Sequence, residues 1–190
     1  MKKFDGLLPI RFDPKELEVN LGEGNFIFVG SGTDAWAVDI PSDWITRFLD
    51  YCNQFDNNYL FQSKDPSRFL EFIGHPVMRK SVLCTTIETN TFYPDIVRNA
   101  PNTRKRAKAM QKLANLGMRT YVTCEPLIQF DLPEMVELVR MCSPVQVNIG
   151  RNSRQDITLP EPTRNEVQAL ITGLQRFTRV VVKSNAKCWI

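Results

Sequence analysis

The sequence predicts an α/β fold built on one parallel β-sheet. Short apolar runs rich in β-branched and aromatic residues alternate with helical segments along the 190 residues of the chain. The runs are also hydrophobic almost throughout, as strands are when helices cover a parallel sheet. The sheet is therefore either a barrel or a doubly wound sheet, and both folds place chemistry at the carboxyl ends of the strands.

Six short runs have the apolar, β-branched and aromatic composition of strands. In chain order they are FIFVG (26–30), YLFQS (59–63), SVLCTTI (81–87), TYVTC (120–124), VQVNIG (145–150) and RVVVKS (179–184). We expect each run to form one strand of the sheet.

Five helical segments separate these strands. They are PSDWITRFLDYCNQF from Pro41, the short DPSRFLEFI from Asp65, NTRKRAKAMQKLANLG from Asn102, LPEMVELVRMC from Leu132 and EPTRNEVQALITGLQRF from Glu161. Thr163 and Glu166 match a capping box at the start of the last helix, and Gly117 closes the third. These signals fix the expected helix boundaries.

Length and composition indicate one globular domain, residues 1–190. The chain is 43% hydrophobic and 24% charged, which is enough to bury a continuous core, and no linker or repeat divides it. No run approaches the roughly 18 apolar residues of a membrane span, and the stretch MKKFDGLLPIRFD does not resemble a signal peptide. We therefore expect a cytoplasmic protein without a membrane partner.

The five cysteines match no zinc or iron–sulfur spacing. They are Cys52, Cys84, Cys124, Cys142 and Cys188. An odd number without a signal peptide indicates reduced thiols. Cys84 and Cys124 lie inside apolar runs, where cysteine behaves as a small buried hydrophobe. We assign no metal ligand, and a four-iron four-sulfur cluster is not supported by the cysteines present.

Every predicted strand ends in polar residues, and in a parallel sheet these ends meet at one rim. The candidate ligand-binding residues are Ser31, Asp34, Lys64, Glu88, Asn90, Glu125, Asn148 and Lys183. Opposite charges gathered at one mouth favour a small zwitterionic ligand such as an amino-acid moiety. The alternative for any one of them is a structural role, as a helix cap or an ion-pair partner.

Other motifs give weaker signals. VGSGTD (29–34) is neither a phosphate loop nor a dinucleotide fingerprint, and DAWAVDIPSDW after it is expected to be a ligand-facing loop. The lone His75 has no partner at catalytic spacing. A basic run from Arg104 to Lys112 puts several positive charges on one helical face, which is expected to be solvated, with phosphate binding as the alternative.

Six segments, taken in order, resemble a known family. They are GNFIFVGSGTDAWAVDIPSDWI, YLFQSKDPSRF, TTIETN, VTCEPLIQFD, VNIGRNS and VKSN. From about Pro9 to Asn185 the chain resembles phage and bacterial radical-SAM-like proteins of unassigned function, distantly similar to the spore photoproduct lyases. The resemblance implies an incomplete, TIM-barrel-like (β/α) barrel of about six parallel strands with outer helices, which binds S-adenosylmethionine at its mouth.

The family pattern at the strand ends matches several of the candidate residues. They are Lys64, Glu88, Glu125, Asn148 and Lys183. Ser31 and Asp34 fall in the loop after the first strand, where the family usually has Ser-Ser-Cys-Asp and where radical-SAM barrels meet the amino group of the cofactor. The resemblance assigns no catalytic residue. We expect Glu88→Ala to weaken ligand binding more than folding, whereas a large loss of stability would mark Glu88 as a structural ion-pair partner.

Members of the family carry a CxxxCxxC loop upstream of the strand that matches FIFVG. Three thiolates of that loop hold a four-iron four-sulfur cluster. This sequence has no such triplet. Two explanations stay open: the chain is a fragment that begins just after the cluster loop, or it is a short form that keeps the barrel for binding. A radical SAM enzyme is expected only if an upstream CxxxCxxC segment exists.

Three functions follow as hypotheses. The first is the cluster-less part of an S-adenosylmethionine-dependent radical enzyme, inactive in radical chemistry by itself. The second is a cluster-free protein, possibly phage-encoded, that binds a small ligand or a partner protein. The third is nucleic-acid binding through the basic helix, which a formal charge of +3 neither requires nor excludes.

The first strand is expected to be an exposed parallel edge, since no strand precedes it in the predicted sheet. Such an edge promotes aggregation unless something covers it. We expect either a dimer or packing of the stretch LPIRF (8–12) against this edge.

Overall fold

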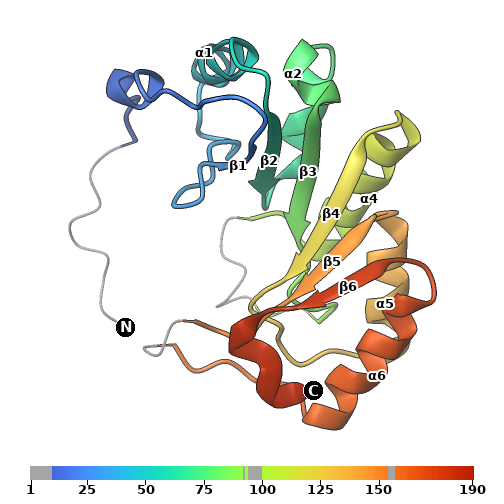
Figure 1. Ribbon diagram of the computed structural model, residues 1–190. Helices are drawn as coiled ribbons and strands as arrows, with labels where there is room; N and C mark the ends of the chain where they lie inside the picture. Colours follow the sequence, from blue (N-terminus) through green and yellow to red (C-terminus); the bar gives the residue numbers. More distant parts are fainter. Residues whose placement is uncertain (1–9, 92, 94–99, 154–156) are drawn as a thin grey trace.

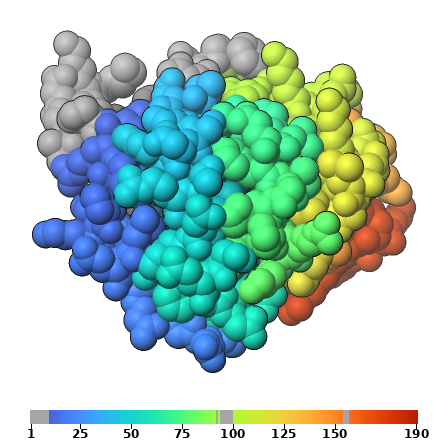
Figure 2. Space-filling view, turned by 90° about the horizontal axis from the view of Figure 1, so that it is seen from above, coloured from blue at the N-terminus to red at the C-terminus, as the bar shows by residue number. Residues whose placement is uncertain are grey.

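Six parallel strands form one sheet in the computed structural model, which describes residues 10–91, 93, 100–153 and 157–190 (Figure 1). The strands are β1 (Phe26–Val29), β2 (Asn58–Ser63), β3 (Ser81–Thr86), β4 (Arg119–Cys124), β5 (Gln146–Ile149) and β6 (Arg179–Val182). Each strand lies beside the one that precedes it in the sequence, in the order β1-β2-β3-β4-β5-β6. Seen from above, the colours accordingly run in sequence order across the molecule (Figure 2).

The strand order decides between the two predicted sheets. A doubly wound sheet reverses its order at a switch point, and the sheet formed by the described residues has no reversal. Within the described residues β1 pairs only with β2 and β6 pairs only with β5, so the sheet is open. The α/β fold is thus confirmed as an incomplete barrel of six parallel strands with outer helices.

Helices connect the strands, largely where the sequence predicts them. The α-helices are α1 (Ser42–Asn53), α2 (Pro76–Arg79), α4 (Thr103–Asn115), α5 (Leu132–Met141) and α6 (Arg164–Gln175), and the 3-10 helices are η1 (Pro14–Leu17), η2 (Pro66–Phe72) and η3 (Ser184–Trp189). The short segment expected from Asp65 is the 3-10 helix η2, and η1, α2 and η3 are additions to the prediction. No helix in the described ranges has both the length and the apolar character to cross a membrane.

The two faces of the sheet carry different residues. The outer face lies against α4, α5 and α6 (Figure 1) and contributes side chains such as Phe61, Leu83 and Val122 to the hydrophobic core. Each fully buried side chain of this kind contributes about 1.5–3 kcal/mol. The strand register places the alternate residues on the opposite side, which we call the inner face. These are Phe26, Phe28, Asn58, Leu60, Gln62, Val82, Cys84, Thr86, Arg119, Tyr121, Thr123, Gln146, Asn148, Arg179 and Val181.

Trp36 organises the core beside β1 and β2. Its side chain is 1% exposed. Its ring makes edge contacts with Phe61 and Phe69, at centroid distances of 5.2 and 4.7 Å. The loop DAWAVDIPSDW is therefore only partly as predicted, because Trp36 within it belongs to the core and not to a ligand-facing surface.

The N-terminal arm packs on α1. The ring of Phe12 lies 5.6 Å from that of Trp44, and the Arg47 guanidinium lies 4.1 Å above the Phe12 ring. No backbone hydrogen bond joins residues 10–12 to β1, while Leu8 and Pro9 lie outside the described residues. Phe26 and Phe28 of β1 remain 57% and 42% exposed. The described part of the arm therefore does not cover the edge of β1 as expected, and the dimer stays a prediction.

Replacement of Trp36 tests how much its contacts with Phe61 and Phe69 stabilise the core. We expect Trp36→Ala to lower the free energy of unfolding by about 3–5 kcal/mol, because it leaves a large cavity. Urea unfolding followed by circular dichroism measures this loss. Val38→Ala is the matched control, since Val38 is 70% exposed on the same loop, and a Trp36→Ala loss no larger than that of the control would contradict the assignment.

Candidate functional site

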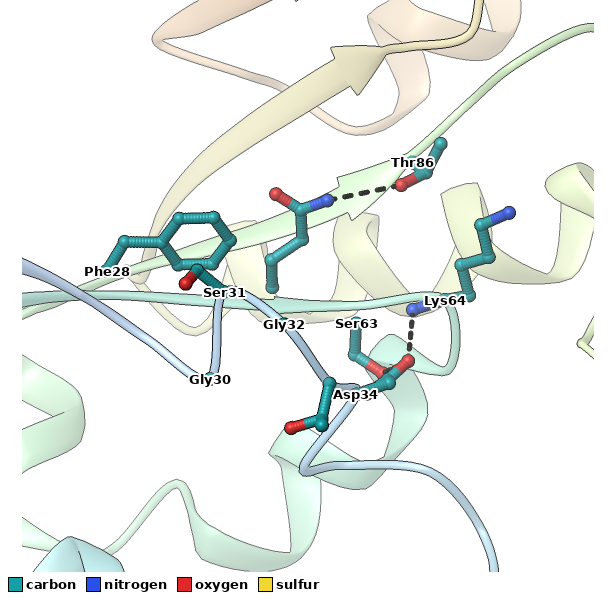
Figure 3. Close-up of a pocket in the computed structure, with 10 residues that line it drawn as sticks. Phe28, Gly30, Ser31, Gly32, Asp34, Ser63, Lys64 and Thr86 are labelled. Atoms are coloured by element: carbon teal, nitrogen blue, oxygen red, sulfur yellow. Dashed lines mark hydrogen bonds between the residues drawn. The ribbon is translucent and has the colours of Figure 1, made fainter. Parts of the chain in front are cut away.

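The carboxyl ends of β1, β2 and β3 surround an open hollow of about 270 Å³. Its lining comes from the loop after β1 and from polar strand ends (Figure 3). The lining residues are Phe28, Gly30, Ser31, Gly32, Thr33, Asp34, Gln62, Ser63, Lys64 and Thr86. Three of the predicted site residues, Ser31, Asp34 and Lys64, therefore share this hollow.

The loop after β1 turns sharply at Gly30. Its φ of +71° lies in the left-handed region that favours glycine. The amide of Thr33 donates to the Gly30 carbonyl at 3.0 Å and closes the turn. This turn leaves Ser31 exposed at the wall of the hollow.

Asp34 fastens this loop to the end of β2. Its Oδ2 accepts hydrogen bonds from Ser63 Oγ at 3.0 Å and from the Lys64 amide at 2.9 Å (Figure 3). Its Oδ1 accepts from the Trp36 amide at 3.1 Å. Both carboxylate oxygens are engaged within the protein, so Asp34 positions the wall of the hollow and the core residue Trp36 together.

Glu88 lies behind the hollow in a buried ion pair. Its side chain is 1% exposed and that of Arg106 is 0% exposed. Arg106 Nη1 donates to Glu88 Oε2 at 2.7 Å and to the Thr86 carbonyl at 2.9 Å, and Nε donates to the Pro101 carbonyl at 2.6 Å. Glu88 is therefore a structural ion-pair partner, which is the alternative that the sequence leaves open for every strand-end residue.

The prediction of a solvated basic face on this helix is wrong at Arg106. The run from Arg104 to Lys112 was expected to present its charges to solvent, but Arg106 is fully buried. Its spacing explains this: Met110 and Leu113, four and seven residues further on, are also buried and so share the core-facing side of α4. The helical period of these apolar residues was the signal that marked Arg106 as internal.

Lys64 links the buried pair to the hollow. Its Nζ lies 3.5 Å from Glu88 Oε1, and its side chain is 43% exposed. Glu88 Oε1 is buried and accepts no hydrogen bond from the residues that the structure describes. Lys64 Nζ makes this ion contact with Glu88 and donates no hydrogen bond to the described residues. The described residues therefore leave the hydrogen-bond donors of this partly exposed ammonium unused.

Asn90 takes part in a helix start instead of the hollow. Its Oδ1 accepts from the Asp131 amide at 2.9 Å, and its Nδ2 donates to Glu134 Oε2 at 3.1 Å. Asp131 in turn caps α5 through the Glu134 amide. Asn90 thus connects the end of β3 to the first turn of α5.

A second polar group forms at the ends of β4, β5 and β6. The Glu125 carboxylate pairs with Lys183 Nζ and accepts from Asn185 Nδ2 at 3.1 Å. It lies across Gly150, where an added Cβ would come within 2.6 Å of Glu125 Oε1. Glycine at this position therefore gives the Glu125 side chain room beside the end of β5.

Asn148 lies within strand β5 and not in the segment that follows it. It is on the inner face of β5, and its Oδ1 accepts from Gln146 Nε2 at 2.8 Å. The ion pairs thus divide the predicted rim in two, with Lys64 and Glu88 on one side and Glu125 and Lys183 on the other.

Two further contacts had no local signal in the sequence. Gln62 Nε2 donates to Thr86 Oγ1 at 3.4 Å, and both residues line the hollow. Arg151 pairs with Glu161 and lies 5.5 Å above the ring of Trp189, which holds η3 against the end of β5. The first contact follows from the pairing of β2 with β3, and the Trp189 contact follows from the packing of η3.

The cysteines do not form a cluster site in the described residues. Cys52, Cys84, Cys124 and Cys142 are buried, and only Cys188 is exposed. Burial raises the pKa of the Cys52, Cys84 and Cys142 thiols to about 12 and raises the pKa of Cys124 as well. Metal ligation requires thiolates. No group of three or more His, Cys, Asp or Glu residues in the described ranges is arranged to hold a metal, so these residues do not fit an iron–sulfur cluster.

Comparisons with known proteins identify no family for this chain. No family model matches it, and no curated protein matches its sequence. One solved structure with a similar trace is the arginine decarboxylase of Paramecium bursaria Chlorella virus, with a TM-score of 0.32 and 9% identity. The alignment covers 85% of this chain and 57% of that one. A likeness of this size says nothing about the function of this chain.

Loss of Arg106 is expected to destabilise the fold. Arg106→Met leaves the Glu88 carboxylate buried without its partner, and breaking such a pair lowers the free energy of unfolding by about 3–5 kcal/mol. Lys105→Met makes the same substitution one residue away on the exposed side and should change it by less than about 0.5 kcal/mol. Urea unfolding measures both, and equal effects would contradict the structural role of the ion pair. Glu88→Ala is now expected to destabilise the protein too.

Thiol labelling tests the burial of the cysteines. In the native protein a chromophoric thiol reagent should react quickly with Cys188 alone, because the other four thiols are buried and protonated. Unfolding in urea should release the remaining four. Cys188→Ser should abolish the fast reaction, and a second fast thiol in that variant would show that one of the buried cysteines is accessible.

Proposed function

We propose that this chain is the ligand-holding part of a radical-SAM-like barrel, and that it binds a small zwitterionic ligand of the S-adenosylmethionine type without radical chemistry of its own. The observation that carries the proposal is the position of Lys64, which is one of the residues that line the hollow and whose ammonium makes no hydrogen bond to the described residues. The sequence resemblance supports the choice of ligand.

The charges around the hollow favour a ligand carboxylate beside Lys64. Arg106 neutralises Glu88 from behind, so Lys64 contributes an additional positive charge at the wall. The Asp34 carboxylate accepts three hydrogen bonds within the protein, which reduces its repulsion of an anion. Hydrogen bonds to charged groups contribute about 1.5–3 kcal/mol, so a ligand carboxylate is expected to bind here.

The same hollow offers an apolar surface and neutral donors. Phe28 lines the hollow and is 42% exposed. Ser31 supplies a hydroxyl, and Gln62 an amide that already bonds Thr86. An aromatic ring of the ligand can pack on Phe28 while its polar atoms bond to the side chains around it.

Calorimetry with S-adenosylmethionine and S-adenosylhomocysteine tests the proposal. We expect micromolar binding of both without a cluster, because both carry the amino-acid carboxylate that Lys64 would bind. Lys64→Met should weaken binding by about tenfold or more, since it removes a charge-assisted hydrogen bond. Lys105→Met, which removes a charge from the exposed side of α4, is the matched control and should leave the affinity unchanged.

The result that overturns the proposal is equally specific. If the folded wild-type protein binds neither compound, or if Lys105→Met weakens binding as much as Lys64→Met, the hollow is not the site. Circular dichroism of Lys64→Met checks that a loss of binding is not a loss of folding, because Lys64 also contacts Glu88.

A further inference from the structure

The inner face of the sheet carries positive charge and no negative charge. Among its fifteen strand positions there are two arginines, Arg119 and Arg179, and no Asp or Glu. The acidic residues Glu88 and Glu125 follow the strands and are paired with cations of their own. The face as a whole is therefore complementary to an anion.

Both arginines are exposed and unpaired in the part of the chain that the structure describes. Neither Arg119 nor Arg179 makes a hydrogen bond or ion pair there, whereas Arg68, Arg140 and Arg151 are each paired with a glutamate. Arg179 lies in register with Gln146 and, through it, with the next strand. The residue of β4 in that row is Tyr121, so Arg119 lies two positions before it, and both arginines stand at the start of their strands with β5 between them.

Aromatic and amide side chains make up much of the accessible inner face, together with the half-buried Leu60 and Val181, whereas its central positions on β3 are buried. Phe26 and Phe28 on β1 are 57% and 42% exposed, although both are large apolar rings. Tyr121 lies in register between Cys84 and Gln146, and Gln146 and Asn148 present amides beside it. Open sheets that bind single-stranded nucleic acids combine aromatic rings, which stack on bases, with basic side chains, which bind phosphates.

We infer that a single strand of nucleic acid binds across the inner face, with bases stacked on Phe26 and Phe28 and phosphates held by Arg119 and Arg179. The six strands span roughly 24 Å from β1 to β6, enough for several nucleotides. An acidic peptide would use the arginines but has no flat rings to stack on the two phenylalanines. This inference does not rest on the ligand proposed for the hollow.

The inner face differs from the other basic surface of the molecule. Helix α4 exposes Arg104, Lys105, Lys108 and Lys112 on the opposite side of the sheet (Figure 1), but its sequence contains no aromatic residue. Binding through α4 would depend on charge alone, whereas binding on the inner face depends on charge and on stacking. This difference makes α4 the matched control.

Fluorescence anisotropy with a labelled single-stranded oligonucleotide of about 15 nucleotides tests the inference. The double substitution Arg119→Met with Arg179→Met should weaken binding more than tenfold and make the salt dependence of log K shallower by about 1.4, because two phosphate contacts are lost. Phe26→Ala, at a ring that does not line the hollow, should weaken binding roughly fivefold with little change in salt dependence. Lys105→Met with Lys108→Met removes the same net charge from α4 and should have less than a twofold effect.

Three results would overturn the inference. One is a folded wild-type protein that does not bind the oligonucleotide at low salt. Another is equal weakening by the two double variants, which would show an unspecific charge effect. The last is displacement of the oligonucleotide by poly-glutamate at equal charge concentration, which would favour an acidic protein partner. The variant with Arg119→Met and Arg179→Met should bind S-adenosylmethionine with the affinity of the wild type. This measurement separates the test of the inner face from the test of the hollow.

Discussion

Glu88 and Arg106 meet where neither charge reaches water, and the arrangement of the strand ends depends on that contact. A carboxylate at the end of the central strand is tolerated there because Arg106 from α4 supplies its counter-charge and also bonds the Thr86 and Pro101 carbonyls. The same contact fixes α4 against β3. It leaves Lys64, on the hollow side of Glu88, as the cation that a ligand would meet.

The open sheet gives the protein two chemically different faces. Its outer face is apolar and buries the core against α4, α5 and α6, so the helices and the hydrophobic effect hold the strands in place. Its inner face would fill with side chains in a closed barrel, but here Phe28 and Arg119 stay exposed. The hollow at the strand ends and the charged, aromatic inner face therefore adjoin each other on one scaffold and share Phe28, Gln62 and Thr86.

Particular residues show how far sequence patterns reach. All six strands and four long helices follow from apolar periodicity and from caps such as Thr163 with Glu166. The predicted loop after β1 was half right, because Trp36 anchors it in the core while Gly30 and Ser31 line the hollow. For Arg106 the charge pattern suggested solvent, although its spacing from Met110 and Leu113 indicated the core.

The sequence alone determined the alternation of strands and helices, the parallel sheet and the gathering of polar residues at one end of it, since these follow from local periodicity and from the chirality of strand–helix–strand connections. Only the tertiary structure decided which of those residues pair. Glu88 finds Arg106, Asn90 finds α5, and Glu125 reaches Lys183 across Gly150. Such partners are 18 to 58 positions apart, and no local pattern specifies contacts that the packing of strands and helices creates.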